Sequence, residues 1–246
     1  AAVEDATTVV AGAREPGADA SLAGPDAPLA AARAGREVGA DPDHPLALAG
    51  ASVVGVEADG TDAVERAPVE RRPGVALPTD DLSDALAHTT LVHADVSGDP
   101  EAATALLADL GVGEDPAPEG YRRLASALAL DAGSAETAER GLAALGRALH
   151  PLAPAGPFET VAGYGDVLDA VARAAPGVAV ALALGYDARE TALDAWRAHA
   201  RRAHDAVRGA DHARHAGLVV ARDAAPVWTV ARLLRDFRSP EPAALA

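Results

Sequence analysis

The clearest hydrophobic pattern in the chain lies between residues 188 and 208. Apolar side chains recur there at alternating spacings of three and four: Leu193, Trp196, Ala200, Ala203 and Val207. This spacing places them on one face of an amphipathic helix, which predicts that the face packs against a core. Several polar residues fall largely off this stripe: His199, Arg201, Arg202 and His204.

The same spacing recurs over residues 227–237, through Val227, Val230, Leu234 and Phe237. The pattern predicts a second amphipathic helix. Arg232, Arg235 and Arg238 are expected nearer its solvent side.

Other helices are indicated by their start signals. Asp99-Pro100 combines an N-cap residue with proline at the first helical position, and predicts a helix that ends at Gly111. Proline in the first turn likewise predicts helices over 28–39 and 45–54. Further helices are expected over 80–87, 119–130, 134–149 and 158–174, with a short one near Ala63.

Short apolar runs predict buried strands over 7–11, 89–93, 178–184 and 218–222. From residue 158 onward predicted strands and helices alternate, which favours an α/β fold with strands covered on both faces. The middle of the chain is nearly all helix, and the Ala-Pro-Ala-Gly-Pro run at 153–157 is the best linker.

The composition is strongly acidic. The chain has 37 acidic and 21 basic residues, a formal charge of −16, and no Lys, Ile, Asn, Gln, Met or Cys. Such usage is typical of a GC-rich genome and of a halophile, whose carboxylates keep proteins soluble at molar salt, where the Debye length is about 3 Å. The acidity therefore weighs little against nucleic-acid binding, although at low salt it opposes it.

The absence of cysteine excludes disulfides, thiolate metal sites and a cysteine nucleophile in this stretch. No apolar run of about 18 residues and no signal peptide are visible, so we expect a soluble, cytoplasmic protein without a membrane partner. Because residue 1 is not Met and the chain stops directly after a predicted helix, we also expect a fragment of a longer protein.

Four segments carry a family resemblance. They are the stretch 156–202, which begins GPFETVAGYGDVLDAV, and the segments GAREPGADASLAG, ERRPGVALPTDDLSDALAHTTLVHADVSGDPEA and TVARLLRDFRSPEP. Together they resemble haloarchaeal RecJ-like proteins of the DHH phosphoesterase superfamily. The resemblance implies an α/β fold in three parts: the end of a DHH-type parallel-sheet domain (1–95), a helical connector (96–155) and an incomplete DHH-associated domain (156–246).

Active members of that family hold two divalent metal ions, usually Mn²⁺, on Asp and His side chains, so that the ions clamp the oxygens of a phosphodiester. An early His-x-Asp-x-Asp-Gly motif is not present here. Gly-Ala-Arg at 12–14 stands where Asp-His-His is expected, and Ser-Val-Val at 52–54 where a further carboxylate is expected. The family's C-terminal glycine-rich His motif is also missing before Ala246. The resemblance thus implies no cofactor in this stretch, and Mn²⁺ only if ligands lie upstream of Ala1.

Other groups of potential metal ligands are weaker candidates. Asp211, His212 and His215 fall between a predicted helix and a predicted strand, where a solvated loop is the default. An acid-rich cluster could combine imidazoles and carboxylates: His88, His93, Asp95, Asp80, Asp81 and Asp84. Asp43-His44 is flanked by prolines and follows no strand. A G-x-S-x-G context, a P-loop and a G-x-G-x-x-G motif are all missing.

Arg232, Arg235, Arg238 and Ser239 form the candidate nucleic-acid-binding cluster. Arginine makes bidentate contacts to phosphate, and the resemblance places these residues where family members grip a single strand. The alternative is a solvated face favoured by the helix C-terminal dipole. The chain has seven aromatic residues, too few for a stacking platform.

Three functions remain open from the sequence. The first is a catalytically degenerate RecJ-like protein that acts on single-stranded DNA in replication or repair and docks on partners such as GINS-type replication proteins. The second is an active Mn²⁺-dependent exonuclease whose ligands lie outside this chain. The third is a structural α/β scaffold without a nucleic-acid role.

Overall fold

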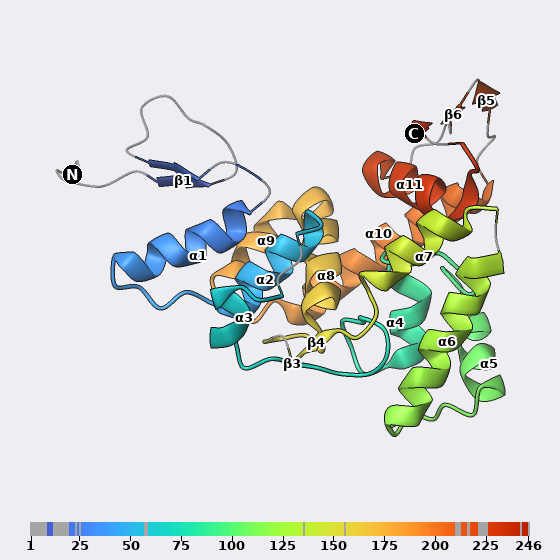
Figure 1. The fold of residues 1–246 in the computed structure, drawn as a ribbon, viewed down its shortest axis with the longest axis horizontal. Coiled ribbons are helices and arrows are strands. Elements are labelled where there is room, and N and C mark those ends of the chain that lie inside the picture. The colour runs from blue at the N-terminus through green and yellow to red at the C-terminus, as the bar shows by residue number, and fades with distance from the viewer. Residues whose placement is uncertain are drawn as a thin grey trace.

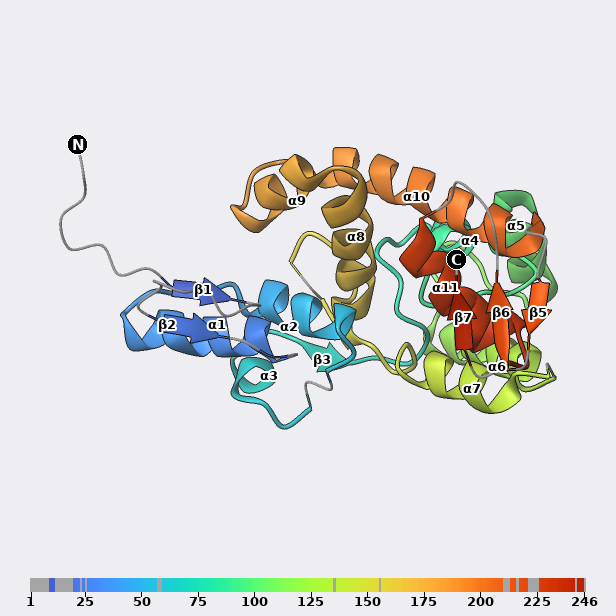
Figure 2. The ribbon, with the colours of Figure 1, turned by 90° about the horizontal axis from the view of Figure 1, so that it is seen from above.

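The protein is mixed α/β and mostly helical, with helices arranged in two lobes (Figures 1 and 2). The computed structural model describes the following residues: 9–11, 20–22, 24, 26–56, 59–134, 136–154, 156–209, 213–215, 217–220, 226–241 and 243–245.

The first lobe contains five helices: α1 (Ala27–Glu37), α2 (His44–Val53), α3 (Asp62–Arg66), α8 (Val161–Ala174) and α9 (Pro176–Ala183). Segments distant in sequence meet here, because α2 packs along α8. The second lobe contains α4 (Leu82–His88), α5 (Pro100–Asp109), α6 (Pro118–Ser134) and α7 (Ala138–Gly146). It also contains α11 (Val227–Leu233), which continues directly into the π-helical turn η1 (Leu234–Arg238).

Helix α10 (Arg189–Gly209) joins the two lobes, running from α9 to the vicinity of α5 (Figure 2). Its first half contributes Leu193 and Trp196 to the core of the first lobe. Its second half contributes Ala203 and Val207 to the core of the second lobe. The stripe read from the sequence is therefore buried as expected, but it is shared between two hydrophobic cores.

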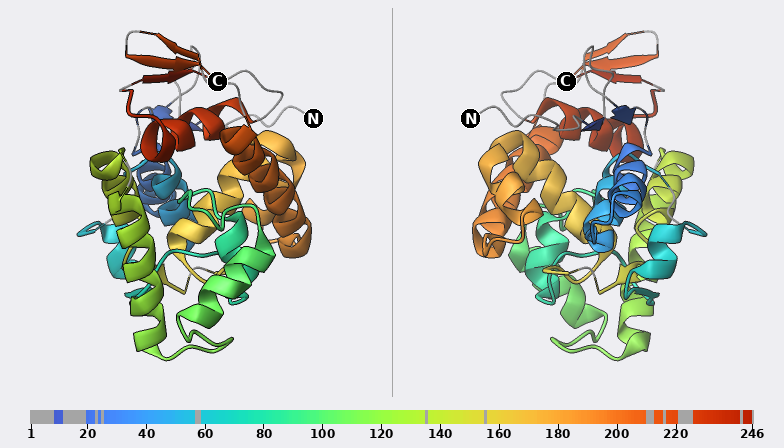
Figure 3. Two further views of the ribbon diagram at one scale, coloured as in Figure 1. Left: turned by 90° about the vertical axis from the view of Figure 1, so that its right-hand side faces the viewer. Right: turned by 90° about the vertical axis from the view of Figure 1, so that its left-hand side faces the viewer.

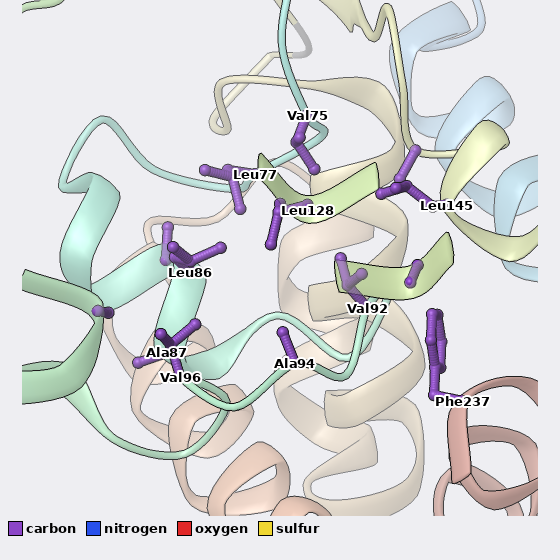
Figure 4. Close-up of a cluster of buried hydrophobic side chains, with 14 of the residues drawn as sticks. Val75, Leu77, Leu86, Ala87, Val92, Ala94, Val96, Leu128, Leu145 and Phe237 are labelled. Atoms are coloured by element: carbon purple, nitrogen blue, oxygen red, sulfur yellow. The ribbon is translucent and has the colours of Figure 1, made fainter. Parts of the chain in front are cut away.

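The core of the second lobe surrounds the irregular segment between α4 and α5 (Figure 4). Val92, Ala94 and Val96 from this segment pack with Leu128 of α6 and Phe237 of η1. Burial of such apolar side chains supplies about 25 cal/mol per Å² of area removed from water. The core of the first lobe joins α1–α3 to α8–α10, and that of the second lobe joins α4–α7 to α10, α11 and η1, so both depend on contacts between distant segments.

Three small sheets flank the helices in the described part of the chain. β1 (Val9–Ala11) and β2 (Ala20–Leu22) pair in parallel, and β3 (Glu70–Arg71) pairs antiparallel with β4 (Leu152–Ala153). The third sheet has the order β5 (Ala213–His215), β6 (Leu218–Val220), β7 (Ala243–Leu245), antiparallel and then parallel. Figure 3 shows this sheet beyond α11, at the outer edge of the second lobe.

The predicted helix start at Asp99 is confirmed by hydrogen bonds. The Asp99 carboxylate accepts from the backbone N–H groups of Glu101 and Ala102, both at 3.0 Å. The residue that caps α4 is Asp81, which accepts from the N–H of Asp84 at 3.1 Å, one position later than the sequence predicts. Helix α7 begins at Ala138, four residues after the predicted start.

Two predicted strands are wrong. Residues 178–183 belong to α9, a helix that has Pro176 at its first position and of which Leu182 alone is buried, so the predicted alternation of buried strand and helix fails there. An apolar run of this length fits a buried strand or a buried helix equally well, and the proline start decides for the helix. Residues 89–93 form no strand, and they connect α4 to α5 as an irregular buried segment.

The predicted three-part division at 95 and 155 stays a prediction. None of the described helices is long and apolar enough to cross a membrane.

Candidate functional site

A cleft of about 980 Å³ lies between the two lobes. Its first wall is formed by the end of α2 and by α8, and its second wall by the end of α7 and by α11 with η1. Figures 1 and 2 show these elements on opposite sides of the region where the lobes meet. The cleft therefore collects residues from the beginning, middle and end of the chain.

Four arginines line this cleft: Arg71, Arg147, Arg232 and Arg235. They come from β3, from the C-cap of α7, from α11 and from η1, respectively. Three carboxylates share the lining: Asp59, Asp166 and Asp169. Asp236, behind this lining, pairs with two of the arginines, so the cleft is close to neutral in a chain whose formal charge is −16.

The Asp166 carboxylate is the most heavily bonded group of the cleft, and it is 4% exposed. It accepts hydrogen bonds from the Thr89 hydroxyl (3.1 Å), the Thr90 N–H (2.9 Å) and the Thr90 hydroxyl (2.5 Å). A fourth bond comes from Nε1 of Trp196 at 3.0 Å. Four donors compensate for the loss of water around the buried charge. Sequence reasoning missed this site, because the donors to Asp166 lie 30 to 77 positions away along the chain.

Arg232 is linked to this network through Thr90, whose hydroxyl oxygen accepts from Nη2 of Arg232 at 3.0 Å. Burial lowers the pKa of Arg232, while the negative charges of Asp166, Asp169 and Asp236 oppose that shift. A guanidinium starts from so high a pKa that it remains a cation at neutral pH. The network therefore holds a fixed positive charge at the cleft wall.

Arg235 lies one turn further along the same wall. Its Nε and Nη2 donate to the Asp236 carboxylate at 2.7 and 3.1 Å, and this pairing raises the pKa of Arg235. Nη2 of Arg147 lies 3.9 Å from the same carboxylate. The side chains of Arg235 and Arg147 are 48% and 54% exposed, so both can contact a ligand that enters from solvent.

The end of α2 faces this arginine wall across the cleft. The Ser52 hydroxyl donates to the carbonyl oxygen of Ala49 at 2.7 Å, and Val53 and Val54 are exposed on the cleft side. The structure thus brings together two features that were predicted separately, namely the ligand-poor segment 52–54 and two of the candidate arginines. The 12–14 segment lies outside the described residues.

Arg238 and Ser239, the other two predicted site residues, are not among the cleft residues. Nη2 of Arg238 lies 3.6 Å from the carboxylate of Asp95. Ser239 is buried, and its hydroxyl oxygen accepts from the N–H of Glu241 at 3.2 Å. Arg71 and Arg147 take part in the cleft instead, and no motif in the sequence marks either of them.

Within the described residues, no group of three or more His, Cys, Asp or Glu side chains is placed to hold a metal ion. Nδ1 of His88 lies 2.9 Å from the carbonyl oxygen of Asp84 and 3.0 Å from its carboxylate, which makes it a donor. Asp211 and His212 lie outside the described residues, and the side chain of His215 does too.

His93 and His204 form a buried pair with their rings stacked 5.1 Å apart. Nε2 of His204 lies 3.0 Å from the carbonyl oxygen of Thr89, which can only accept, so this nitrogen carries the proton. Nδ1 of the neutral His204 ring then accepts from Nδ1–H of His93 at 2.9 Å. The expectation that His199 and His204 lie off the buried face of α10 is wrong, because α4 and α11 cover that side of the helix.

Two comparisons with known proteins give matches, both to an uncharacterized protein. A family model described as the C-terminal domain of uncharacterized protein rrnAC1427 matches residues 210–246, the region that contains Arg232 and Arg235. The chain is 52% identical over 217 residues to uncharacterized protein rrnAC1427 of Haloarcula marismortui, a halophilic archaeon. That alignment covers 85% of this chain and 58% of the relative, so the chain spans a little over half of the relative's length.

Proposed function

We propose that this chain is a RecJ-like member of the DHH superfamily that binds the phosphodiester backbone of single-stranded DNA in the cleft between its lobes, without hydrolysing it. The observation that supports this proposal is the convergence of Arg71, Arg147, Arg232 and Arg235 on one cleft of a protein whose formal charge is −16.

The chemistry of the arginine wall suits phosphate. A guanidinium presents several N–H donors in a plane and forms two parallel bonds to phosphate oxygens. Arg232 is anchored to Thr90 and is held in place before any ligand arrives. Arg147 and Arg235 are half exposed, and in the free protein they share Asp236. A phosphate would bind through guanidinium N–H groups that Asp236 leaves free, because the Asp236 side chain is 6% exposed and loss of its partners would leave a buried charge unpaired.

The side chains that face the arginines do not suit hydrolysis. Two-metal hydrolysis requires carboxylate or imidazole ligands that place two cations beside the scissile phosphate. Ser52, Val53 and Val54 stand where the family resemblance implies such a ligand, and the valines have no donor atom. The proposed role is therefore to hold a strand within a larger replication or repair assembly. GINS-type proteins are the proposed partners, and residues 1–95, 96–155 and 156–246 the proposed parts of the DHH-type arrangement.

The proposal is tested by fluorescence anisotropy of a labelled single-stranded oligonucleotide, titrated with the protein over a series of KCl concentrations. We expect Arg235→Glu and Arg147→Glu each to weaken binding roughly tenfold, or about 1.4 kcal/mol. Each should also lower the slope of log K against log salt by about 0.7, the single-strand value for one lost phosphate contact.

Arg122→Glu is the matched control. Arg122 lies on α6, its side chain is 60% exposed, and it pairs only locally with Glu119. Reversing the charge of Arg122 changes the net charge of the chain by the same amount but leaves the cleft intact, so binding of the oligonucleotide should change little. Equal losses for all three variants would show a general charge effect, and the cleft would not be the binding site. An absence of binding by the wild-type chain would favour the scaffold alternative.

A further inference from the structure

The chain contains two tryptophans in opposite environments. Trp196 is fully buried on α10 and bonded to Asp166. Trp228 lies in the first turn of α11 and is 74% exposed. Among the residues that the structure describes, none buries this large apolar ring. Exposed aromatic side chains next to cations are typical of nucleic-acid-binding surfaces.

Trp228 shares a helix face with the cleft arginines. The residues of α11 and η1 that pack into the protein include Thr229, Val230, Leu233 and Leu234. At 3.6 residues per turn, the Cα atoms of Trp228 and Arg232 lie on the opposite face, one turn apart, with about 6 Å of rise between them, and the guanidinium of Arg232 turns back from there to Thr90. Arg235 follows on the same wall of the cleft. Trp228 itself is not among the residues that line the cleft, so its indole lies outside the cleft, one helical turn before Arg232.

We propose that the indole of Trp228 stacks on a base of the bound strand whose phosphates contact Arg232 and Arg235. This inference rests on the proposed function and names the part of the ligand that the arginines do not recognise. A base and its phosphate are joined through one sugar, so one nucleotide can contact both side chains. Stacking tolerates any sequence because every base has a π-face. The small number of aromatic residues rules out an extended platform, but one exposed indole is enough for one base.

A nucleic acid fits this surface better than a protein partner does. A protein that covered Trp228 would also cover the neighbouring arginines, and it would have to supply carboxylates to avoid burying unpaired cations. Each nucleotide of a single strand supplies both a flat base and an anionic phosphate. A protein partner is therefore an outcome of the test and not part of the proposal.

The test uses the intrinsic fluorescence of the chain at molar KCl. Wild type is titrated with oligothymidylate and with an abasic sugar–phosphate oligomer of the same length, while anisotropy of end-labelled strands reports binding. We expect oligothymidylate to quench tryptophan emission and the abasic oligomer to bind without quenching. Trp228→Ala should abolish the quenching and weaken oligothymidylate binding about tenfold, with little effect on the abasic oligomer. Val180→Ala, on the exposed face of α9, is the control for loss of a surface apolar side chain.

The outcomes separate the two proposals. If Trp228→Ala keeps the quenching, or binds oligothymidylate as tightly as wild type does, stacking by Trp228 is wrong although the cleft still binds phosphates. If Trp228→Ala weakens both oligomers equally, the side chain contributes without contacting a base, and the inference is again wrong. If wild type binds neither oligomer, both the proposed function and the stacking by Trp228 are wrong.

Discussion

Nε1 of Trp196 donates a 3.0 Å hydrogen bond to Oδ2 of Asp166, and both side chains are almost completely buried. Trp196 belongs to α10, the helix that spans both lobes, and Asp166 belongs to α8, one wall of the cleft. Thr90 accepts from Arg232 and donates to the same carboxylate. The position of a cleft arginine thus depends on a bond in the protein core.

Asp166→Ala is expected to lower the free energy of unfolding by about 2–5 kcal/mol. The indole N–H of Trp196 and the backbone N–H of Thr90 would stay buried without an acceptor, and each such donor costs about 1–3 kcal/mol. Chemical denaturation at constant KCl measures the change. The control is Asp194→Ala. The Asp194 side chain is 79% exposed, so this substitution should change the free energy of unfolding by less than about 0.5 kcal/mol. Similar small changes in both variants would show that the Asp166 network is not structural.

Gly165→Ala should destabilise the contact between α2 and α8. A methyl group at Gly165 would collide with the hydroxyl of Ser52 and lie 2.8 Å from the carbonyl oxygen of Ala49. Such overpacking costs about 1–3 kcal/mol. Gly177→Ala in α9 is the matched control, because its added methyl group meets nothing within 4 Å and should stabilise the helix by about 0.5–1 kcal/mol. Opposite shifts in melting temperature are expected, and a shift in the same direction would contradict this packing.

Stability is expected to fall on acidification below about pH 6.5. Burial lowers the pKa of His93 to about 2 and that of His204 to about 4, and burial also lowers the pKa of His199. The folded state therefore takes up these protons later than the unfolded state, whose histidines titrate near 6.5. The stabilisation is complete above pH 6.5 and is lost as pH falls towards the folded pKa values, at up to about 1.4 kcal/mol per pH unit for each histidine.

Histidine protonation dominates the interval from pH 6.5 to 4. The lowered pKa values of Asp62 and Asp84 act mainly near and below their unfolded value of 3.8, and the raised pKa of Asp131 partly offsets the loss at the lower end of the interval. Denaturation curves at fixed KCl should show a steep loss for wild type and a shallower one for His93→Phe, which keeps a stacked ring but removes one titrating group. An unfolding free energy that is constant across this interval would contradict the buried neutral pair.

The chain is expected to release no nucleotides from single-stranded DNA when Mn²⁺ is added at molar KCl. The reason is the apolar segment at Val53 and Val54, which cannot hold a cation beside the arginine wall. Denaturing gels of an end-labelled strand provide the measurement, with an active Mn²⁺-dependent nuclease in the same buffer as the positive control. A metal-dependent activity that shortens the labelled strand and copurifies with the chain would support the exonuclease alternative instead.

The sequence predicts those elements whose signals are local. Asp99 and Pro100 mark a helix start by backbone geometry alone, and the stripe of α10 follows from its period. The run 178–184 was predicted as a strand because an apolar segment without periodicity carries no information about its backbone conformation. Its helical state follows from Pro176 and from packing on α8 and α10, and only the first of these is visible in the sequence.

The candidate site is predictable only in part, for a similar reason. Arg232 and Arg235 share a helix and could be grouped by spacing, whereas Arg71 and Arg147 reach the cleft through the pairing of β3 with β4 and through the end of α7. The buried carboxylate of Asp166 meets donors more than 70 residues earlier in the chain, at Thr89 and Thr90. Such contacts depend on how distant segments pack, which local patterns do not encode.

The most direct test of the cleft as a binding site is photo-crosslinking of the wild-type chain to a single strand that carries 5-iododeoxyuridine, followed by mass spectrometry of the modified peptides. Crosslinks are expected in residues 143–152 and 226–238, which contribute the second wall, and they should disappear with excess unlabelled strand. Crosslinks confined to α5 and α6, on the far side of the second lobe, would contradict the proposed cleft.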